Sequence, residues 1–203
     1  VEPGNTASRC YGISCDVGTT TVVGTLVDLT TGKDMATASS INGQARYGHD
    51  VISRIHYILE QEDGLTLLQT AVIDTVNLII EQLLAPHDVD PEDVYEMTVV
   101  GNATMTHLIL GVHPRSLGFM PYVPVMGHSL DVEARTLGIG INPAANIHVL
   151  PTIAGFVGAD TVAALLAAGM DEPGDGVQMV ADVGTNCEIV IRHNDRLIAC
   201  STP

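Results

Sequence analysis

One short turn occurs twice in this sequence, and each copy follows a strand-like apolar run. The first copy is Asp16-Val17-Gly18-Thr19, within GISCDVGTTTVVGTLVD at positions 12–28, and the second is Asp182-Val183-Gly184-Thr185, within MVADVGTNCEIVI at 179–191. A glycine directly after a strand permits a tight turn and leaves the backbone N–H groups open to a ligand. The repeat therefore predicts a duplicated architecture built from two strand–turn–strand units.

Both turns carry groups that suit phosphate. In the first turn the hydroxyl groups of Thr19, Thr20 and Thr21 lie beside the amides, and Asp16 precedes them at a strand end. A carboxylate does not bind phosphate itself, but it can hold Mg²⁺ or its water molecules. The second turn offers the same set in Asp182, Gly184, Thr185 and Asn186.

Two such turns that face each other across a cleft would clamp the phosphates of a nucleotide from both sides. Phosphoryl transfer requires that kind of positioning and electrostatic stabilisation. A single Asp-x-Gly turn is ordinary hairpin chemistry, so the phosphate prediction depends on the repeat.

The composition argues against several classes of partner. The chain has 24 Asp and Glu but only 8 Lys and Arg, a formal net charge of −16. A nucleic-acid surface or an anionic membrane would need clustered cations. No run reaches the roughly 18 consecutive apolar residues of a membrane span, and the first residues lack a signal-peptide core. We therefore expect neither nucleic-acid nor membrane binding.

The four cysteines, Cys10, Cys15, Cys187 and Cys200, form no Cys-x-x-Cys pair. Cys15 and Cys187 lie in apolar strand-like runs, where a cysteine usually behaves as a small hydrophobic residue. Metal ligation is the less favoured interpretation, because a closed site needs about four converging donors. Reduced, structural thiols indicate a cytoplasmic protein.

The order of apolar patterns predicts an α/β fold. Runs rich in β-branched residues at 11–15, 20–29 and 35–41 indicate a three-stranded meander, and those at 95–100 and 147–150 indicate two more strands. Two helical patterns follow position 48, and the second has apolar residues three and four apart from Leu65 to Leu83. A short helix at 103–110 and a small-residue helix at 154–168 are also expected, whereas 113–146 is expected to be mostly loop. The prediction is a five-stranded, mixed sheet flanked by helices.

The domain boundaries follow from these patterns. Residues 1–10 are polar and small, so we expect a linker or disordered terminus. Residues 11–170 are then the first lobe, and the turn-forming residues 171–176 are a linker between lobes. Residues 177–203 repeat the opening of the chain, which indicates the first strands of a second, truncated lobe.

The two turns resemble those of the actin-like ATPase superfamily, which has a ribonuclease-H-like fold and includes sugar kinases, heat-shock chaperone ATPases and actin. This resemblance implies that Asp16 and Asp182 are catalytic residues that position Mg²⁺ through water. It also implies that Asp160, at the start of a connecting helix, orients metal-bound waters. The implied ATP-binding residues are Gly18, Thr19, Thr20, Thr21, Gly184, Thr185 and Asn186.

Three longer runs resemble the reductive activators of corrinoid proteins: QARYGHDVISRI at 44–55, VGNATM at 100–105 and GFVGADT at 155–161. Members of that family join a ferredoxin-like iron–sulfur domain to an actin-like ATPase domain, and use ATP to reduce a Co(II) corrinoid to Co(I). The resemblance implies ATP and Mg²⁺ as cofactors, and a corrinoid protein or corrinoid-dependent methyltransferase as partner. The family's cluster cysteines have no counterpart here, so an iron–sulfur cluster is expected only in a domain outside this chain.

Other interpretations stay open. A small-molecule kinase would need a substrate hydroxyl and a catalytic base facing the γ-phosphate, and a non-catalytic actin-like module would use this lobe for assembly with a partner or as a homodimer. Asn102 either lines the cleft or caps the following helix, and capping is favoured. Arg46 and Arg54 are candidates for phosphate or an acidic partner, with salt bridges to nearby acids as the preferred interpretation.

Overall fold

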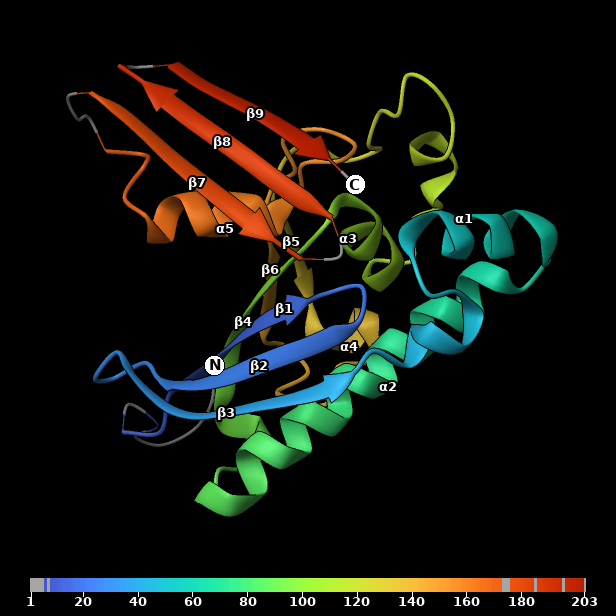
Figure 1. Ribbon diagram of the computed structural model, residues 1–203. Helices are drawn as coiled ribbons and strands as arrows, with labels where there is room; N and C mark the ends of the chain where they lie inside the picture. The colour runs from blue at the N-terminus through green and yellow to red at the C-terminus, as the bar shows by residue number, and fades with distance from the viewer. Residues whose placement is uncertain (1–5, 7, 173–175, 185, 195, 203) are drawn as a thin grey trace.

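The computed structural model describes residues 6, 8–172, 176–184, 186–194 and 196–202. Within these ranges the chain forms a six-stranded sheet and a separate three-stranded sheet (Figure 1). The larger sheet has the order β3-β2-β1-β4-β6-β5. Its strands are β1 (Tyr11–Val17), β2 (Thr21–Asp28), β3 (Lys33–Ile41), β4 (Val94–Gly101), β5 (Leu130–Glu133) and β6 (Asn146–Val149).

The larger sheet is mixed, as predicted. β1, β2 and β3 form an antiparallel meander, and β4 runs parallel to β1. β6 is parallel to β4, while β5 pairs antiparallel with β6. Parallel neighbours end at the same edge of a sheet, so the turn after β1 lies beside the turn after β4. That edge carries the first Asp-Val-Gly-Thr turn.

Helices pack against the larger sheet and connect its strands. The helices are α1 (Val51–Glu60), α2 (Gly64–Leu84), α3 (Ala103–Ile109), α4 (Ala134–Leu137) and α5 (Ala159–Ala167), with 3-10 turns at η1 (Gly43–Tyr47), η2 (Ala85–His87), η3 (Pro91–Asp93) and η4 (Pro114–Leu117). α2 lies along β2 and β3 (Figure 1). A Cβ at Gly24 in β2 would lie 2.7 Å from Cγ2 of Ile79, so the glycine lets helix and strand pack closely.

The predicted apolar stripe of α2 is buried in the main core, where it includes Leu68, Val72, Val76, Ile79 and Leu83. The segment Gly64–His87 is also the one helix in the described part of the chain that is long and apolar enough to cross a membrane. More than half of its most apolar stretch is buried inside the protein, as in the core helix of a globular protein.

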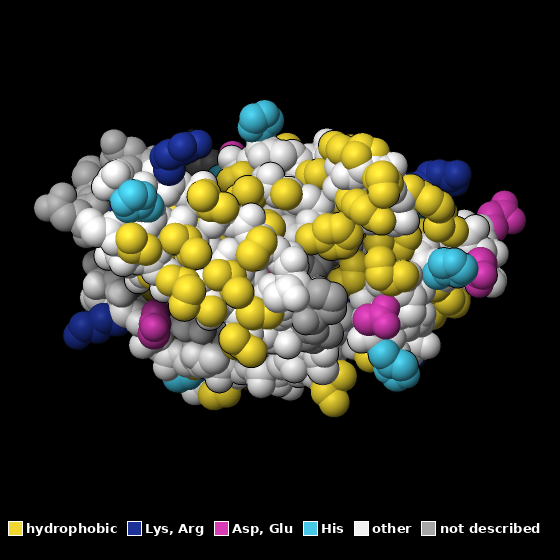
Figure 2. Space-filling view, turned by 45° about the horizontal axis from the view of Figure 1, so that its top comes forward, with side chains coloured by type: hydrophobic (Ala, Val, Ile, Leu, Met, Phe, Trp, Pro, Cys, Tyr) yellow, Lys and Arg dark blue, Asp and Glu magenta, His cyan; other side chains and the backbone are white. Residues whose placement is uncertain are grey.

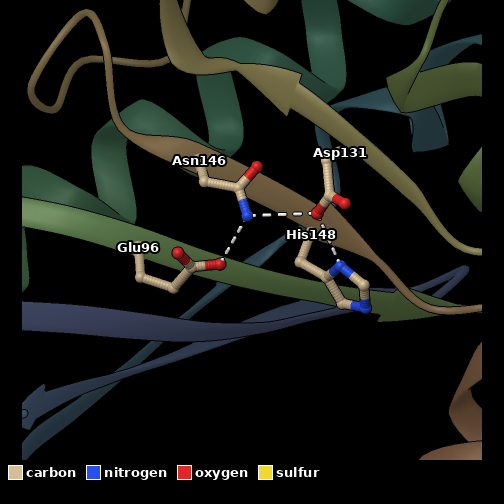
Figure 3. A network of polar contacts seen from close by, with 4 residues as sticks. All are labelled: Glu96, Asp131, Asn146 and His148. Carbon is tan, nitrogen blue, oxygen red and sulfur yellow. Dashed lines mark hydrogen bonds and ion pairs between the residues drawn. The ribbon is translucent and has the colours of Figure 1, made fainter.

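The sheet has a sixth strand that the sequence did not predict. β5 lies in the segment 113–146, which was expected to be mostly loop, and Asp131 pairs directly opposite His148 on β6. Nδ1 of His148 lies 2.7 Å from Oδ1 of Asp131, and Nδ2 of Asn146 donates to both Asp131 and Glu96 (Figure 3). The pairing has polar side-chain contacts on one face, so no β-branched run indicates it.

The small-residue helix also begins later than predicted, at Ala159 rather than Ala154. Ala154 and Val157 form an isolated β-bridge instead. A Cβ at Gly155 would lie 2.0 Å from the carbonyl oxygen of Tyr122, so this segment packs against a distant loop by its backbone. Tertiary contact therefore overrides the helical propensity of these small residues.

The smaller sheet consists of β7 (Val177–Val183), β8 (Cys187–His193) and β9 (Arg196–Thr202), all antiparallel. α5 contacts both β4 and β7, so it lies between the two sheets (Figure 1). Leu165, Met170 and Val190 form a small core that joins this helix to the smaller sheet.

Hydrophobic side chains gather in two areas of the face seen in Figure 2. The exposed hydrophobic residues of the described chain include Val177, Met179, Leu197 and Ile198 of the smaller sheet, and Phe119, Met120, Val123 and Val125 of the segment after η4.

Candidate functional site

The two turns face one polar pocket. The pocket has a volume of about 260 Å³ and is lined by Asp16, Gly18, Thr19, Thr20, Thr21, Asn102, Asp160, Asp182, Gly184, Asn186 and Glu188. Every predicted site residue is present in this set except Thr185, which lies outside the described residues. Residues from β1, β2, α5, β7 and β8, together with the two turns and Asn102 just after β4, therefore converge at one place, as the repeat suggested.

The first turn is held in a tight conformation by glycine. The Gly18 amide donates to the carbonyl oxygen of Thr21 at 3.0 Å. A Cβ at Gly18 would lie 2.5 Å from that same oxygen, which no side chain tolerates. The sequence needs glycine at this position for close backbone approach rather than for a positive φ.

Two buried side chains anchor the carbonyl groups of this turn from the core side. Nδ2 of Asn42 donates to the carbonyl of Gly18 at 2.9 Å, and Nη2 of Arg54 donates to the carbonyl of Thr19 at 2.5 Å. Both peptide bonds are trans, so the N–H of the next residue points opposite to each carbonyl. The amides of Thr19 and Thr20 therefore point away from the side chains of Asn42 and Arg54, and both threonines line the pocket.

Asn102 combines the two roles that the sequence left open. Its Oδ1 accepts from the Met105 amide at 3.0 Å and so caps α3. Its Nδ2 donates to Oγ1 of Thr19 at 2.9 Å, which connects the end of β4 to the first turn. The preferred interpretation, capping, is confirmed, and Asn102 lines the pocket as well.

Acidic side chains crowd the pocket. Burial, followed by repulsion from Asp160 and Asp182, raises the pKa of Asp16 to about 6. Burial and repulsion from Asp182 raise the pKa of Asp160, although the Thr161 amide opposes the shift. The carboxylates repel one another where no cation lies between them, so these acids suit a hydrated divalent cation such as Mg²⁺, which they would hold through its water molecules. In the described ranges no three His, Cys, Asp or Glu side chains are arranged to ligate a metal directly.

Glu188 is a pocket residue that sequence reasoning missed. It lies directly opposite Asp182 in the β7–β8 hairpin, so both side chains project from the same face. Glu188 is buried and accepts from Oγ of Ser201 at 2.9 Å. Burial, and more weakly Asp160 and Asp182, raise its pKa. The hairpin symmetry about the turn was the signal, since pairing in register places these two acids side by side.

A second cavity of about 540 Å³ adjoins the first and shares Asn102, Asn186 and Glu188 with it. Its other walls combine apolar and polar side chains from α1, α3, the 155–156 segment and β9. The site is thus a small polar pocket that continues into a larger, partly apolar space.

The preferred interpretation of Arg54 was wrong. Among the described residues it forms no salt bridge, and its side chain is completely buried behind the first turn. The exposed Arg46 instead lies over the ring of Tyr47, with its guanidinium carbon 4.8 Å from the ring centroid.

The larger sheet is mixed and contains an antiparallel meander. The turn between its strands β1 and β2 faces the turn between β7 and β8 of the smaller sheet across a polar pocket. This arrangement defines a protein of the actin-like ATPase fold. A 2-dehydro-3-deoxygalactonokinase-like protein from Sinorhizobium meliloti shares this fold, with a TM-score of 0.52 and 15% identity over 94% of this chain and 53% of that one.

The chain belongs to the RACo middle region family, whose model matches residues 11–173. A solved structure of a reductive activator for corrinoid, iron–sulfur protein superposes with a TM-score of 0.94 and 39% identity, covering 98% of this chain and 31% of that one.

Two characterised relatives are also similar. The corrinoid activation enzyme RamQ of Eubacterium limosum is 36% identical over 192 residues, which is 95% of this chain and 32% of RamQ. The Co(II) methylated amine-specific corrinoid protein reductase of Methanosarcina barkeri is 25% identical, over 94% of this chain and 36% of the reductase. The chain spans about a third of the length of these relatives.

Proposed function

We propose that this chain is part of the ATP-binding domain of a reductive activator that converts a corrinoid protein, or a corrinoid-dependent methyltransferase, from Co(II) to Co(I). The observation that carries the proposal is the convergence of both Asp-Val-Gly-Thr turns on one pocket. Similarity to the corrinoid activation enzyme RamQ and to a solved corrinoid activator supports the choice of substrate.

Within this proposal each group has a definite task. The Thr19 and Thr20 amides, together with the threonine hydroxyls and the second turn, bind the ATP phosphates. Asp16 and Asp182 would hold Mg²⁺ through water, and Asp160 would orient those waters. The ion supplies positive charge beside the phosphates. The polar pocket lies between elements of the two sheets, so binding there favours one arrangement of the proposed lobes, 11–170 and 177–203.

Coupling to ATP has an energetic reason. An uphill one-electron transfer costs about 1.4 kcal/mol for each ~59 mV of unfavourable potential. An iron–sulfur domain outside this chain would supply the electron, and the cobalt of the partner corrinoid would be the substrate that accepts it. ATP binding and hydrolysis then offset that cost by favouring the conformation in which transfer occurs. All of these steps take place in the cytoplasm.

The test is spectroscopic. The intact protein that contains this chain is mixed with its Co(II) corrinoid protein and a low-potential reductant, with and without Mg-ATP, and the Co(I) absorption band is followed. The proposal predicts that Co(I) accumulates only with ATP. Equal Co(I) formation with and without ATP would contradict it.

One observation favours a second candidate, a small-molecule kinase. Glu188, whose pKa is raised by burial, lies where the phosphate pocket opens into the larger cavity, as the base of a kinase would. A kinase predicts transfer of the γ-phosphate to a hydroxylated sugar or acid. Release of inorganic phosphate alone, in the presence of a panel of such compounds, distinguishes the activator from the kinase.

A further inference from the structure

Arg54 is a buried cation for which the described structure shows no carboxylate partner. Its side chain has no exposed surface, and burial lowers its pKa to about 10, so it remains protonated at neutral pH. Asp50 is the acid that acts on it electrostatically, yet the Asp50 carboxylate accepts from the Ser53 amide at 2.7 Å to cap α1. Buried charges are usually paired, so this arginine needs an explanation.

Neutral acceptors surround the guanidinium group instead. Nε donates to the carbonyl of Gly48 at 3.0 Å, and Nη1 donates to Oε1 of Gln44 at 2.9 Å. Nη1 also lies 3.2 Å from Sδ of Met105, and Nη2 donates to the carbonyl of Thr19. Gln44 is itself fixed, because its Nε2 donates to the carbonyl of Leu68 at 2.9 Å. The guanidinium group is therefore held rigidly, and its Nη2 contacts the first Asp-Val-Gly-Thr turn.

One peptide group separates this positive charge from the pocket. The Thr19 carbonyl faces Arg54, and the Thr20 amide on the same peptide plane faces the opposite way. A charged donor on the carbonyl polarises the peptide, which strengthens the N–H as a donor on its other side. An anion held by that N–H would complete the pairing that Arg54 lacks.

We infer that Arg54 is a positioning residue for the nucleotide: it fixes and polarises the Thr19–Thr20 peptide, so that the Thr20 amide binds a phosphate oxygen. This inference rests on the proposed ATP-binding function. It assigns the run QARYGHDVISRI a role in phosphate binding although none of its residues lines the phosphate pocket. Asn42 likewise donates to the neighbouring carbonyl of Gly18, but its amide is uncharged. Of the two side chains that hold this turn, only Arg54 therefore adds a positive charge.

The experiment separates folding from binding. Arg54→Met replaces a buried charge by an apolar side chain of similar length, a change that often keeps or raises stability. In the intact protein we expect the melting temperature of Arg54→Met to equal or exceed that of the wild type, while calorimetry shows Mg-ATP binding weakened about tenfold or more. Arg54→Lys, which keeps the charge but not the fork, gives an intermediate loss. Arg46→Gln is the matched control, because it removes an exposed arginine of the same run, and it binds Mg-ATP like the wild type.

The outcomes are distinct. Wild-type affinity in Arg54→Met overturns the inference and leaves ATP binding itself intact. If Arg54→Met does not fold, Arg54→Lys decides, and wild-type affinity in that variant overturns the inference. A wild-type protein that does not bind Mg-ATP overturns the proposed function and this inference with it.

Discussion

Asn102 and Thr19, 83 residues apart, are joined by a 2.9 Å hydrogen bond from the amide of one to the hydroxyl of the other. The bond ties the end of β4 to the first Asp-Val-Gly-Thr turn, while the same asparagine caps α3. Helix position and turn position are therefore linked through one side chain.

This linkage makes the two roles of Asn102 separable. Serine is a good N-cap residue but is too short to make both contacts. Asn102→Ser should therefore keep the thermal stability of the protein. It should weaken Mg-ATP binding several-fold, which corresponds to roughly the free energy of one hydrogen bond. Asn102→Ala should lose both, at a cost of about 1 kcal/mol in stability. The measurements are thermal unfolding and calorimetry. Equal ATP affinity for Asn102→Ser and wild type would show that the Thr19 contact is irrelevant to binding.

The two turn glycines should differ in their tolerance of a methyl group. A Cβ at Gly18 would lie 2.5 Å from a backbone oxygen, whereas the nearest heavy atom to a Cβ at Gly184 lies 3.6 Å away. Gly18→Ala should therefore lower the free energy of unfolding by about 1–3 kcal/mol, and Gly184→Ala should change it little. Urea denaturation of the two variants checks this, and equal losses would contradict the geometry described for the first turn.

The pocket acids predict a pH dependence with a definite sign. The pKa of Asp16 is about 6 in the folded protein, above its ordinary value of 3.8, so the folded state binds the more protons between these values. The free energy of unfolding contributed by this group therefore falls as pH rises through about 4 to 6, and the penalty is complete above that window. Asp16→Asn should raise stability at pH 7.5 and have less effect at pH 4.

The matched control for this prediction is Asp34→Asn, which removes an exposed acid on β3 outside the pocket. Denaturation of the nucleotide-free protein at both pH values supplies the comparison. A stabilisation by Asp16→Asn that is the same at both values would mean that repulsion within the pocket is not its cause.

His107 should be a structural histidine. It is completely buried on α3, where Nδ1 contacts the carbonyl of Ala103 at 2.6 Å and Nε2 accepts from the Val125 amide at 3.0 Å. His107→Ala should lower the free energy of unfolding by about 2–4 kcal/mol through the cavity and the unpaired groups. The exposed His56 is the control, and its replacement by alanine should be nearly neutral.

The pH sign for His107 is opposite to that of Asp16. Burial lowers the pKa of His107 below 6.5, although the Ala103 carbonyl opposes the shift, so the unfolded chain gains a proton that the folded chain excludes. Stability from this group is therefore present above about pH 6.5 and falls as the pH drops below it. A His107→Ala variant whose stability loss is the same at pH 5.5 and pH 8 would contradict this arrangement.

Local patterns were sufficient for much of the fold. The meander and α2 carry long, regular periodicities, and the repeated turn indicated a site built from both ends of the chain. β5 was not predicted, because a four-residue strand with polar side-chain pairs has no periodic apolar pattern. The start of α5 escaped because Gly155 packs against Tyr122, a contact between residues 33 positions apart.

The site was predictable where chemistry is local and missed where it depends on packing. The aspartates and glycines of the turns are recognisable from sequence alone. The brace from Arg54 and the side-by-side placement of Asp182 and Glu188 depend on tertiary pairing, which composition does not reveal. The small number of Lys and Arg residues drew attention to Arg54, but only the structure shows that it contacts the turn rather than an acid.

The most direct test of the account is ATP hydrolysis by the intact protein carrying Asp182→Asn. Asparagine has nearly the same shape but lacks the charge that would hold metal-bound water, so we expect hydrolysis to fall about a hundredfold or more while circular dichroism and thermal unfolding stay near wild type. Asp171→Asn, an exposed acid outside the pocket, should leave hydrolysis unchanged. Wild-type turnover in Asp182→Asn would contradict the claim that the two turns form one ATP phosphate site.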